Sequence, residues 1–253
     1  MMNDKLYSIA LPALTVAAFI ALWQVAAGHY PPEQFPSPID VVKAIRELAE
    51  TGVLWGHIGV SLARFAVAYL MAVVAAIPLG LFFGRWTRCH RAVDPLIQLL
   101  RPISPIAWFP LAVLWFGIGN APAIFIIFLA AFYPVLLSTI SAVRSIPPVY
   151  LKVAANFGAR PWAVFLRVVI PAAFPGIMVG LHIAVGTAWI HLVAGEMLGA
   201  QSGLGYMIVD ARNFLRTDAI MAGMLIVGGL GLAIYRGMKG MERAIGRRWG
   251  VNP

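Results

Sequence analysis

Five long stretches of the chain carry no charged side chain, and they constrain the possible folds more than any other feature. They are residues 6–28, 65–84, 102–143, 168–195 and 219–235. A helix crosses the hydrocarbon core of a bilayer with roughly 20 apolar residues, so each stretch can hold a span. The third stretch can hold two, because Gly117–Pro122 interrupts it. We therefore expect an all-α integral membrane protein with about six spans, near residues 6–28, 62–84, 100–117, 122–142, 171–196 and 217–237.

Composition excludes the soluble classes. Charged residues make up 11% of the chain, against about 25% in soluble domains. The single cysteine, Cys89, rules out an intramolecular disulfide. The basic residues behind the net charge of +9 stand at the ends of apolar stretches, which indicates topology in a lipid bilayer and not a nucleic-acid surface. We expect one membrane domain over residues 1–253, with its core at 57–240, and a first span that is retained because it exceeds a signal-peptide core.

Lysine and arginine are distributed unequally between alternate loops. The loops 85–101 and 143–170 and the tail after residue 235 are basic, and 143–170 has no acidic residue. The loop 29–60 holds two basic and four acidic residues, and 118–121 holds none. Cytoplasmic loops of membrane proteins carry the excess of lysine and arginine. We therefore expect the loop 143–170 and both termini in the cytoplasm.

The second of these basic loops contains a short segment rich in small residues. Ala154, Gly158 and Ala159 are expected at closely spaced helical positions. Small side chains there would let the surface of another protein approach the helix backbone. Pro161 favours the start of a new helix, because proline fits the first helical turn.

The segment Lys152–Pro171, with Gly158 followed by the apolar run Val168–Pro171, resembles the EAA loop of the permease subunits of ATP-binding-cassette (ABC) importers. The resemblance implies the type I ABC importer transmembrane fold and a coupling loop at about 146–168 that inserts into a groove of a separate ATPase subunit. The family's acidic first position is Lys152 here, so the facing ATPase surface is expected to be charged differently. The implied coupling residues are Lys152, Val153, Ala154, Ala155, Gly158, Ala159 and Pro171.

Three further segments are similar to permeases for nitrate, taurine and alkanesulfonates, namely Phe35–Ile45, Leu100–Gly119 and His191–Asp218. This resemblance implies import of a small oxoanion across a bacterial cytoplasmic membrane. It also implies a homodimer that forms the pathway, two ATPase subunits and an extracytoplasmic substrate-binding protein. In the first segment Ser37 is expected to cap a short amphipathic helix, which lies at the outer interface or packs on the spans.

Polar and aromatic residues inside the spans are candidates for a substrate pathway, since such groups are costly in a membrane. Glu196, near the outer end of the fifth span, is expected to act as a gate or packing residue paired with Arg212 or a backbone amide, or to reach headgroup water. His191 and Thr187 share a helical face. Arg101 would favour an anion, although its charge also fits a cytoplasmic loop. The candidates are Arg101, Ser104, Trp108, Thr187, Trp189, His191 and Glu196.

No catalytic, metal or cofactor site is expected. No stretch matches the phosphate-binding motif GxxxxGK[ST], so ATP–Mg would bind the partner ATPase and this chain would not be an enzyme. His182 and His191 lack a further ligand for a metal. Two alternatives stay open: an ion-coupled secondary transporter that acts without an ATPase, and an ABC importer for bicarbonate, cyanate or a pyrimidine-type solute.

Overall fold

The computed structural model describes residues 2–248, with side chains described from residue 10 to residue 243. The basic residues Arg247 and Arg248 of the tail therefore lie outside the described side chains. Every regular element within these residues is helical. In chain order the elements are α1 (Met2–Ala27), α2 (Pro38–Glu50), α3 (Val53–Arg85), α4 (Thr87–Leu100), the 3₁₀-helix η1 (Pro105–Trp108), α5 (Phe109–Phe116), α6 (Asn120–Arg144), α7 (Pro148–Asn156), α8 (Pro161–Val164), the π-helical turn η2 (Phe165–Val169), α9 (Ile170–Gly199), α10 (Leu204–Asn213) and α11 (Thr217–Arg248).

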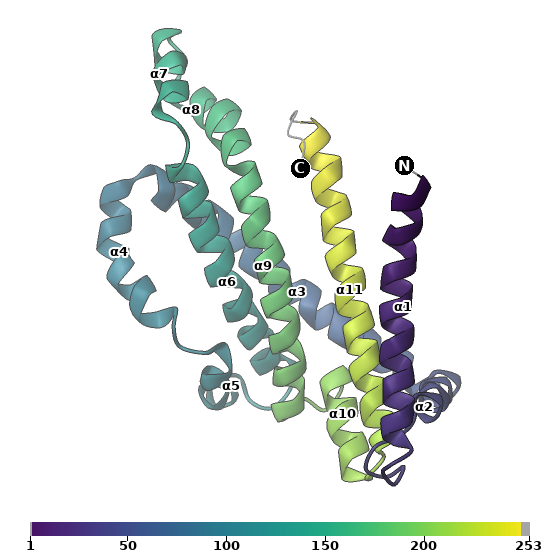
Figure 1. The fold of residues 1–253 in the computed structure, drawn as a ribbon. Helices are drawn as coiled ribbons and strands as arrows, with labels where there is room; N and C mark the ends of the chain where they lie inside the picture. Colours follow the sequence, from purple (N-terminus) through teal and green to yellow (C-terminus); the bar gives the residue numbers. More distant parts are fainter. Residues whose placement is uncertain (1, 249–253) are drawn as a thin grey trace.

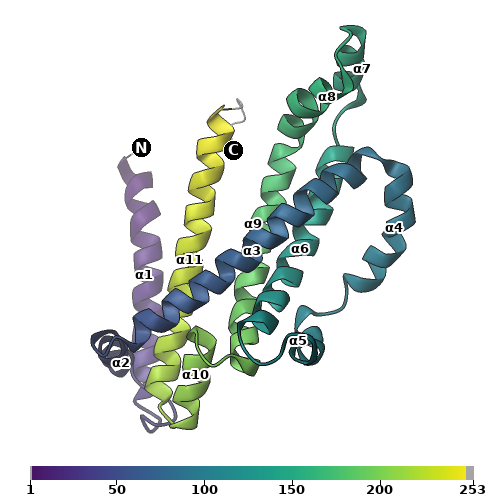
Figure 2. The same cartoon turned by 180° about the vertical axis from the view of Figure 1, so that it is seen from behind.

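Five of the helices that the structure describes are long and apolar enough to cross a membrane, and they confirm five of the six expected spans. They are α1, α3, α6, the continuous helix of α8 and α9, and α11. Helix α3 begins at Val53 rather than near residue 62 and has 33 residues. In Figure 2 it crosses obliquely in front of α6 and α9, and this oblique course accounts for its extra length.

The third expected span, near residues 100–117, is wrong as a single helix. Helices α4 and α5 are long and apolar enough to cross a membrane only when they are taken together. They are bent by 84° at the break between them. Proline lacks the N–H that an inner helical turn needs and clashes with the preceding turn. Pro102 and Pro105 therefore end the helix at Leu100, and Pro110 is tolerated because it stands in the first turn of α5.

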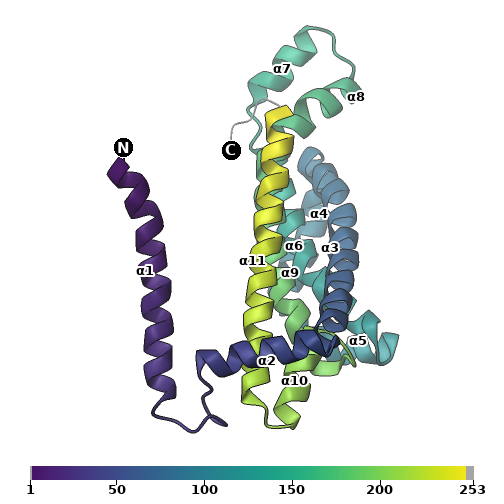
Figure 3. The same cartoon turned by 90° about the vertical axis from the view of Figure 1, so that its right-hand side faces the viewer.

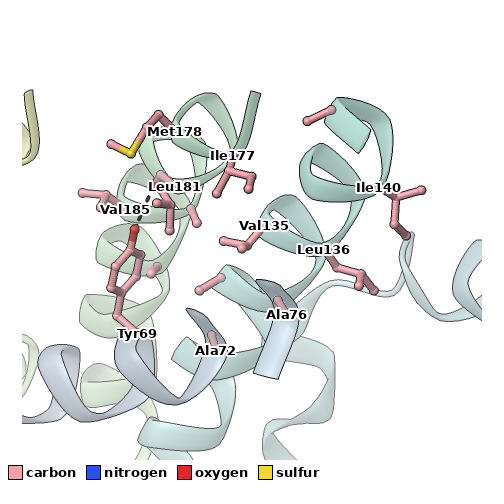
Figure 4. Close-up of a cluster of buried hydrophobic side chains, with 14 of the residues drawn as sticks. Tyr69, Ala72, Ala76, Val135, Leu136, Ile140, Ile177, Met178, Leu181 and Val185 are labelled. Carbon is pink, nitrogen blue, oxygen red and sulfur yellow. Dashed lines mark hydrogen bonds between the residues drawn. The ribbon is translucent and has the colours of Figure 1, made fainter. Parts of the chain in front are cut away.

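The hydrophobic core lies where α6 packs between α3 and α9. Val135 of α6 lies between Ile177 of α9 and the alanines Ala72 and Ala76 of α3, and Leu136 belongs to the same buried cluster (Figure 4). The hydroxyl of Tyr69 on α3 donates a hydrogen bond to the carbonyl oxygen of Leu181 on α9 at 3.0 Å. These three helices supply most of the largest buried apolar cluster, and the other elements are arranged around them.

Helix α2 packs on the spans, which decides between the two placements expected for it. The Oγ of Ser37 accepts a hydrogen bond from the backbone N–H of Asp40 at 3.3 Å, so the expected N-cap is confirmed. Val41 and Ala44 are fully buried against Ala222 of α11. Helix α2 thus lies across the end of α11 (Figure 3).

An ion pair fixes this position of α2. The guanidinium of Arg216, just before α11, donates to the two carboxylate oxygens of Glu47 at 2.6 and 2.8 Å. The same hydrogen bonds hold the pKa of Glu47 below its ordinary value. Helix α2 is therefore attached to α11 by apolar packing and by charge.

The molecule has two distinct ends (Figure 1). At one end, called the α7 end, α7 and α8 project beyond the bundle, and the chain termini lie on the same side. At the other, the α10 end, are α2, α5 and α10. Helix α1 stands beside α11 without packing along it (Figure 3), and its side chains from residue 10 to residue 22 are exposed.

Candidate functional site

The break in the third span places Arg101 deep in the bundle. Helix α4 runs from the α7 end to about the middle of the molecule, where it stops (Figure 1). Arg101, the next residue, lines a cavity together with Ala130, Tyr133 and Ile183 in the middle of α6 and α9. Ala130 is about 15 Å along α6 from the α10 end. Of the two readings of Arg101, a pathway residue or a residue of the basic loop 85–101, the cavity supports the first, because most of that loop is helix α4.

The cavity has a volume of about 390 Å³ and is partly open. That volume lies within the range of small-molecule sites. It brings together four of the seven pathway candidates, from two segments: Arg101 and Trp108 from the broken span, and Thr187 and His191 from α9. The rest of the wall is mainly apolar, and none of the described residues that line it is acidic. The remaining lining residues are Ile103, Pro105, Leu129, Ala130, Tyr133, Pro134, Leu137, Ser138 and Ile183.

The two polar residues of α9 in the cavity have different hydrogen bonds. The hydroxyl of Thr187 bonds to the carbonyl oxygen of Ala130 on α6 at 3.0 Å, so it joins two helices. The Nδ1 of His191 lies 2.7 Å from the carbonyl oxygen of Thr187. A carbonyl oxygen can only accept, so Nδ1 carries the proton, and in a neutral ring Nε2 is then the acceptor. His191 is thus the better placed of the two to contact a solute.

The structure does not bring Ser104 or Trp189 into the cavity. Ser104 is exposed, in the turn between α4 and η1. Trp189 is buried, its indole N–H donates to the carbonyl oxygen of Val227 on α11 at 3.1 Å, and its ring meets Phe65 of α3 edge to face. Trp189 therefore packs three helices together.

Glu196 belongs to a buried polar cluster near the α10 end. Its carboxylate is 2.8 Å from Nη1 of Arg64 on α3, and both side chains are almost fully buried. The hydroxyl of Ser61 lies 2.8 Å from each carboxylate oxygen and accepts from the backbone N–H of Leu204. The expected ion pair between Glu196 and Arg212 is wrong, because Arg212 is exposed on α10. The alternative of a backbone amide is confirmed by the N–H of Gly205, at 2.9 Å.

Arg64 connects this cluster to two further segments. Its Nε and Nη2 donate to the side-chain oxygen of Asn120, at the start of α6. Its Nη1 and Nη2 donate to the carbonyl oxygen and hydroxyl of Ser202. Burying an ion pair costs desolvation energy, which these additional hydrogen bonds offset. The cluster thus joins α3, α6, α9 and the loop before α10.

The start of α10 closes over the Glu196 carboxylate because two residues there, Gly203 just before the helix and Gly205 in its first turn, lack side chains. A Cβ on Gly203 would lie 2.2 Å from a carboxylate oxygen of Glu196, and Gly203 has a φ of 107°. A Cβ on Gly205 would lie 2.4 Å from the carbonyl oxygen of Val193. Only glycine fits at either position, so the backbone itself solvates the acid.

The segment resembling the EAA loop projects at the α7 end. Helix α7 ends at Asn156, so Gly158 and Ala159 are not helical as expected but form the turn that follows. Gly158 has a φ of 67°, and the N–H of Ala159 donates to the carbonyl oxygen of Ala154 at 3.0 Å. Pro161 begins α8 as expected. Lys152, Val153 and Ala155 are exposed on α7, and Ala154 is half-buried.

Two aromatic side chains on this projection were missed by the sequence analysis. Phe157 is 86% exposed and Trp162 is 68% exposed. Large exposed aromatic residues beside a tight turn are typical of contact surfaces, and that signal is present in the sequence. We define the coupling turn as residues 152–162.

Pro171, the last of the coupling candidates, follows a widened turn at the base of this projection. In the π-helical turn η2 the N–H of Ile170 bonds to the carbonyl oxygen of Phe165, five residues earlier. Pro171 cannot donate to Arg167, four residues before it, and its ring would crowd that carbonyl in an α-helix. The proline therefore accounts for a local change of helical pitch between the coupling turn and α9.

The chain is similar to proteins of one family over most of its length. A family model described as "binding-protein-dependent transport system inner membrane component" matches residues 68–251. A putative ABC transporter permease protein of Methanocaldococcus jannaschii is 38% identical, over 95% of this chain and 91% of the relative. The taurine transport system permease protein of Escherichia coli is 33% identical, over 97% and 96%. The nitrate import permease protein of Synechococcus elongatus is 33% identical, over 92% and 88%.

Solved structures show the same fold. An inward-facing conformation of the MetNI methionine ABC transporter aligns with a TM-score of 0.57 and 20% sequence identity. The alignment covers 74% of this chain and 96% of the solved chain. The fold is therefore that of the transmembrane subunit of a type I ABC importer, as expected.

Proposed function

The chain belongs to the binding-protein-dependent transport system inner membrane component family, and from this we propose that it is the permease subunit of an ATP-driven importer for a small oxoanion. Relatives named for taurine, aliphatic sulfonates and nitrate support this class of solute. Family membership removes the reason for an ion-coupled transporter that works alone. Two copies would pair around a two-fold axis. Each would dock one ATPase subunit carrying ATP–Mg, and an extracytoplasmic binding protein would deliver the solute.

In this proposal the α7 end faces the cytoplasm of a bacterial inner membrane. Support comes from the charges of the coupling turn, which carries Lys152 and Arg160 and no acidic residue. The chain termini lie on the same side (Figure 1). The coupling turn would then lie where an ATPase subunit can reach it, and the cavity with Arg101 would open toward the second copy.

The observation that carries the coupling role is the exposure of Phe157 at the tip of the molecule, 86%. A side chain of this size in water is unfavourable and suits a hydrophobic groove on a partner. Lys152, on the same turn, would face an acidic group of the ATPase. Closure of the ATPase dimer on ATP would draw two coupling turns together and rock the spans between two states.

Co-purification with the ATPase and binding protein encoded beside this chain tests the proposal. We expect a stoichiometric complex whose ATP hydrolysis is stimulated by loaded binding protein. Phe157→Ala should reduce that stimulation about ten-fold or more, in line with loss of a hot-spot aromatic. Gly158→Asp, which forces a non-glycine residue into a left-handed turn, should uncouple transport in the same way.

Trp55→Ala is the matched control, because it removes an exposed aromatic at the α10 end. It should leave co-purification of the ATPase subunit unchanged, because it lies far from the coupling turn. Normal solute-stimulated hydrolysis by Phe157→Ala and Gly158→Asp would contradict the coupling role.

A further inference from the structure

We propose that the cavity around Arg101 binds organic anions with an apolar body and no amino group, such as simple alkanesulfonates, in preference to nitrate or taurine. This inference rests on the proposed function for its physiological meaning, but the site itself is argued from the cavity. It narrows the solute from oxoanions in general to one chemical class.

Among the described side chains, the guanidinium of Arg101 has no ion-pair partner. None of the ion pairs between described side chains includes Arg101, and no aspartate or glutamate lines the cavity. An ionised group at mid-depth in a membrane is costly and is normally paired. A guanidinium presents several N–H donors in a plane, which match the oxygens of a sulfonate or carboxylate. An anionic solute would supply the missing partner.

Arg64 shows what the same side chain looks like when the protein itself supplies the partners. Its guanidinium contacts Glu196, Asn120 and Ser202, and it is 4% exposed. Arg101 is exposed to the cavity. The first arginine is therefore a structural residue, and the second is free to bind.

The apolar wall argues against a small inorganic anion. Trp108, Leu129 and Ile183 line the cavity with five further apolar residues or prolines. Nitrate would use the arginine but leave this surface in contact with water, whereas an alkyl chain would cover it. Each buried methylene contributes about 0.8 kcal/mol, or roughly four-fold in affinity.

The absence of an acid in the cavity wall argues against an aminosulfonate. The ammonium group of taurine would stand near Arg101 without a carboxylate to balance it. Like charges raise the free energy of such a complex. Propanesulfonate has a methyl group where taurine has the ammonium, so the two form a matched pair of probes.

The test is direct binding to the full-length chain in lipid nanodiscs, measured by calorimetry without ATPase or binding protein. We expect propanesulfonate to bind at least about ten-fold more tightly than taurine, and nitrate not to compete. Arg101→Gln should weaken propanesulfonate binding about ten-fold or more, as loss of a charge-assisted hydrogen bond does. Arg101→Lys should restore part of the affinity.

Two further variants make the test specific. Trp108→Ala should weaken hexanesulfonate more than methanesulfonate, because it removes part of the apolar wall. Arg88→Gln changes an exposed arginine of α4, the helix that precedes Arg101, and should leave all affinities unchanged. Thermal unfolding of each variant separates loss of the site from loss of the fold.

Three results would overturn the inference: no binding of any alkanesulfonate, as when a second copy fills the cavity; equal competition by nitrate or taurine; or unchanged binding by Arg101→Gln. These results leave the importer assignment intact if the complex still hydrolyses ATP on stimulation. Failure of the complex to form would instead count against the proposed function, since the binding test needs no ATPase.

Discussion

At the scale of single residues, the most constrained group is the Glu196 carboxylate. It is fully buried, and it accepts from Arg64, from Ser61 and from the backbone N–H of Gly205. A buried charge that is compensated on all sides is stable, but one that loses its partner is not. The cluster therefore holds α3, α9 and the loop before α10 in one arrangement at the α10 end.

Replacing Arg64 alone should be strongly destabilising. Arg64→Met leaves Glu196 buried without its cation, which we expect to cost about 3–5 kcal/mol. The double variant Arg64→Met with Glu196→Gln should lose less stability than the two single variants lose when their losses are added, because the two charges interact directly. Thermal unfolding in detergent of all four proteins measures this. Additive losses would mean that the two residues act independently.

At the scale of elements, glycines decide how closely the central helices approach. Gly80 and Gly84 of α3 face Thr139 and Val143 of α6. A Cβ added to Gly80 would lie 2.5 Å from the Cβ of Thr139, and one added to Gly84 would lie 2.6 Å from the Cβ of Val143. Gly176 and Gly180 of α9 face Ala142 and Ser138 of α6 in the same way, at 2.5 Å. Both helices thus use glycines four residues apart, the spacing that brings membrane helices into close contact.

The pair Gly180→Ala and Gly186→Ala tests this packing. Both changes add one methyl group to α9 and raise helix propensity equally, but only the first places it against Ser138, since nothing lies within 4 Å of Gly186. We expect Gly180→Ala to lower the free energy of unfolding by about 1–3 kcal/mol through overpacking. Gly186→Ala should leave the free energy of unfolding unchanged. Thermal unfolding in detergent measures both, and equal stability of the two variants would show that the helices separate freely.

At the scale of the whole molecule, the two ends have different surfaces and, in our proposal, face different compartments. The coupling turn projects at the α7 end, and α2 covers the spans at the other (Figures 1 and 3). An amphipathic helix attached through Arg216 and a projecting basic turn suit opposite sides of a membrane. Arg101 lies between these two ends, so a solute that passes from one side of the membrane to the other must pass the depth at which Arg101 lies.

Cysteine labelling tests this topology. In a Cys89→Ser background, a membrane-impermeant maleimide should label Glu50→Cys on α2 in intact cells. It should label Ala155→Cys on α7 only after the membrane is permeabilised. Both side chains are exposed in the structure, so failure to react would reflect the membrane and not burial. The reverse pattern would invert the orientation.

Sequence alone determined the all-helical class, five of the spans, the cap of α2 and the start of α8 at Pro161. These features depend on neighbouring residues. Runs such as 168–195 without a charge predict a span, and Ser37 before Pro38 predicts a helix start. The interactions that produce these features act within a few helical turns of one segment, so the features can be predicted without knowledge of the rest of the fold.

Only the tertiary structure decided where the polar groups of the interior meet. Arg64 and Glu196 are 132 residues apart along the chain, and Arg101 reaches the level of His191 only because α4 stops halfway. In the sequence Arg64 and Arg101 look alike, since each borders an apolar stretch. Whether a charge is buried and paired or open to a cavity depends on which helices pack against it, and that is set by contacts between distant segments.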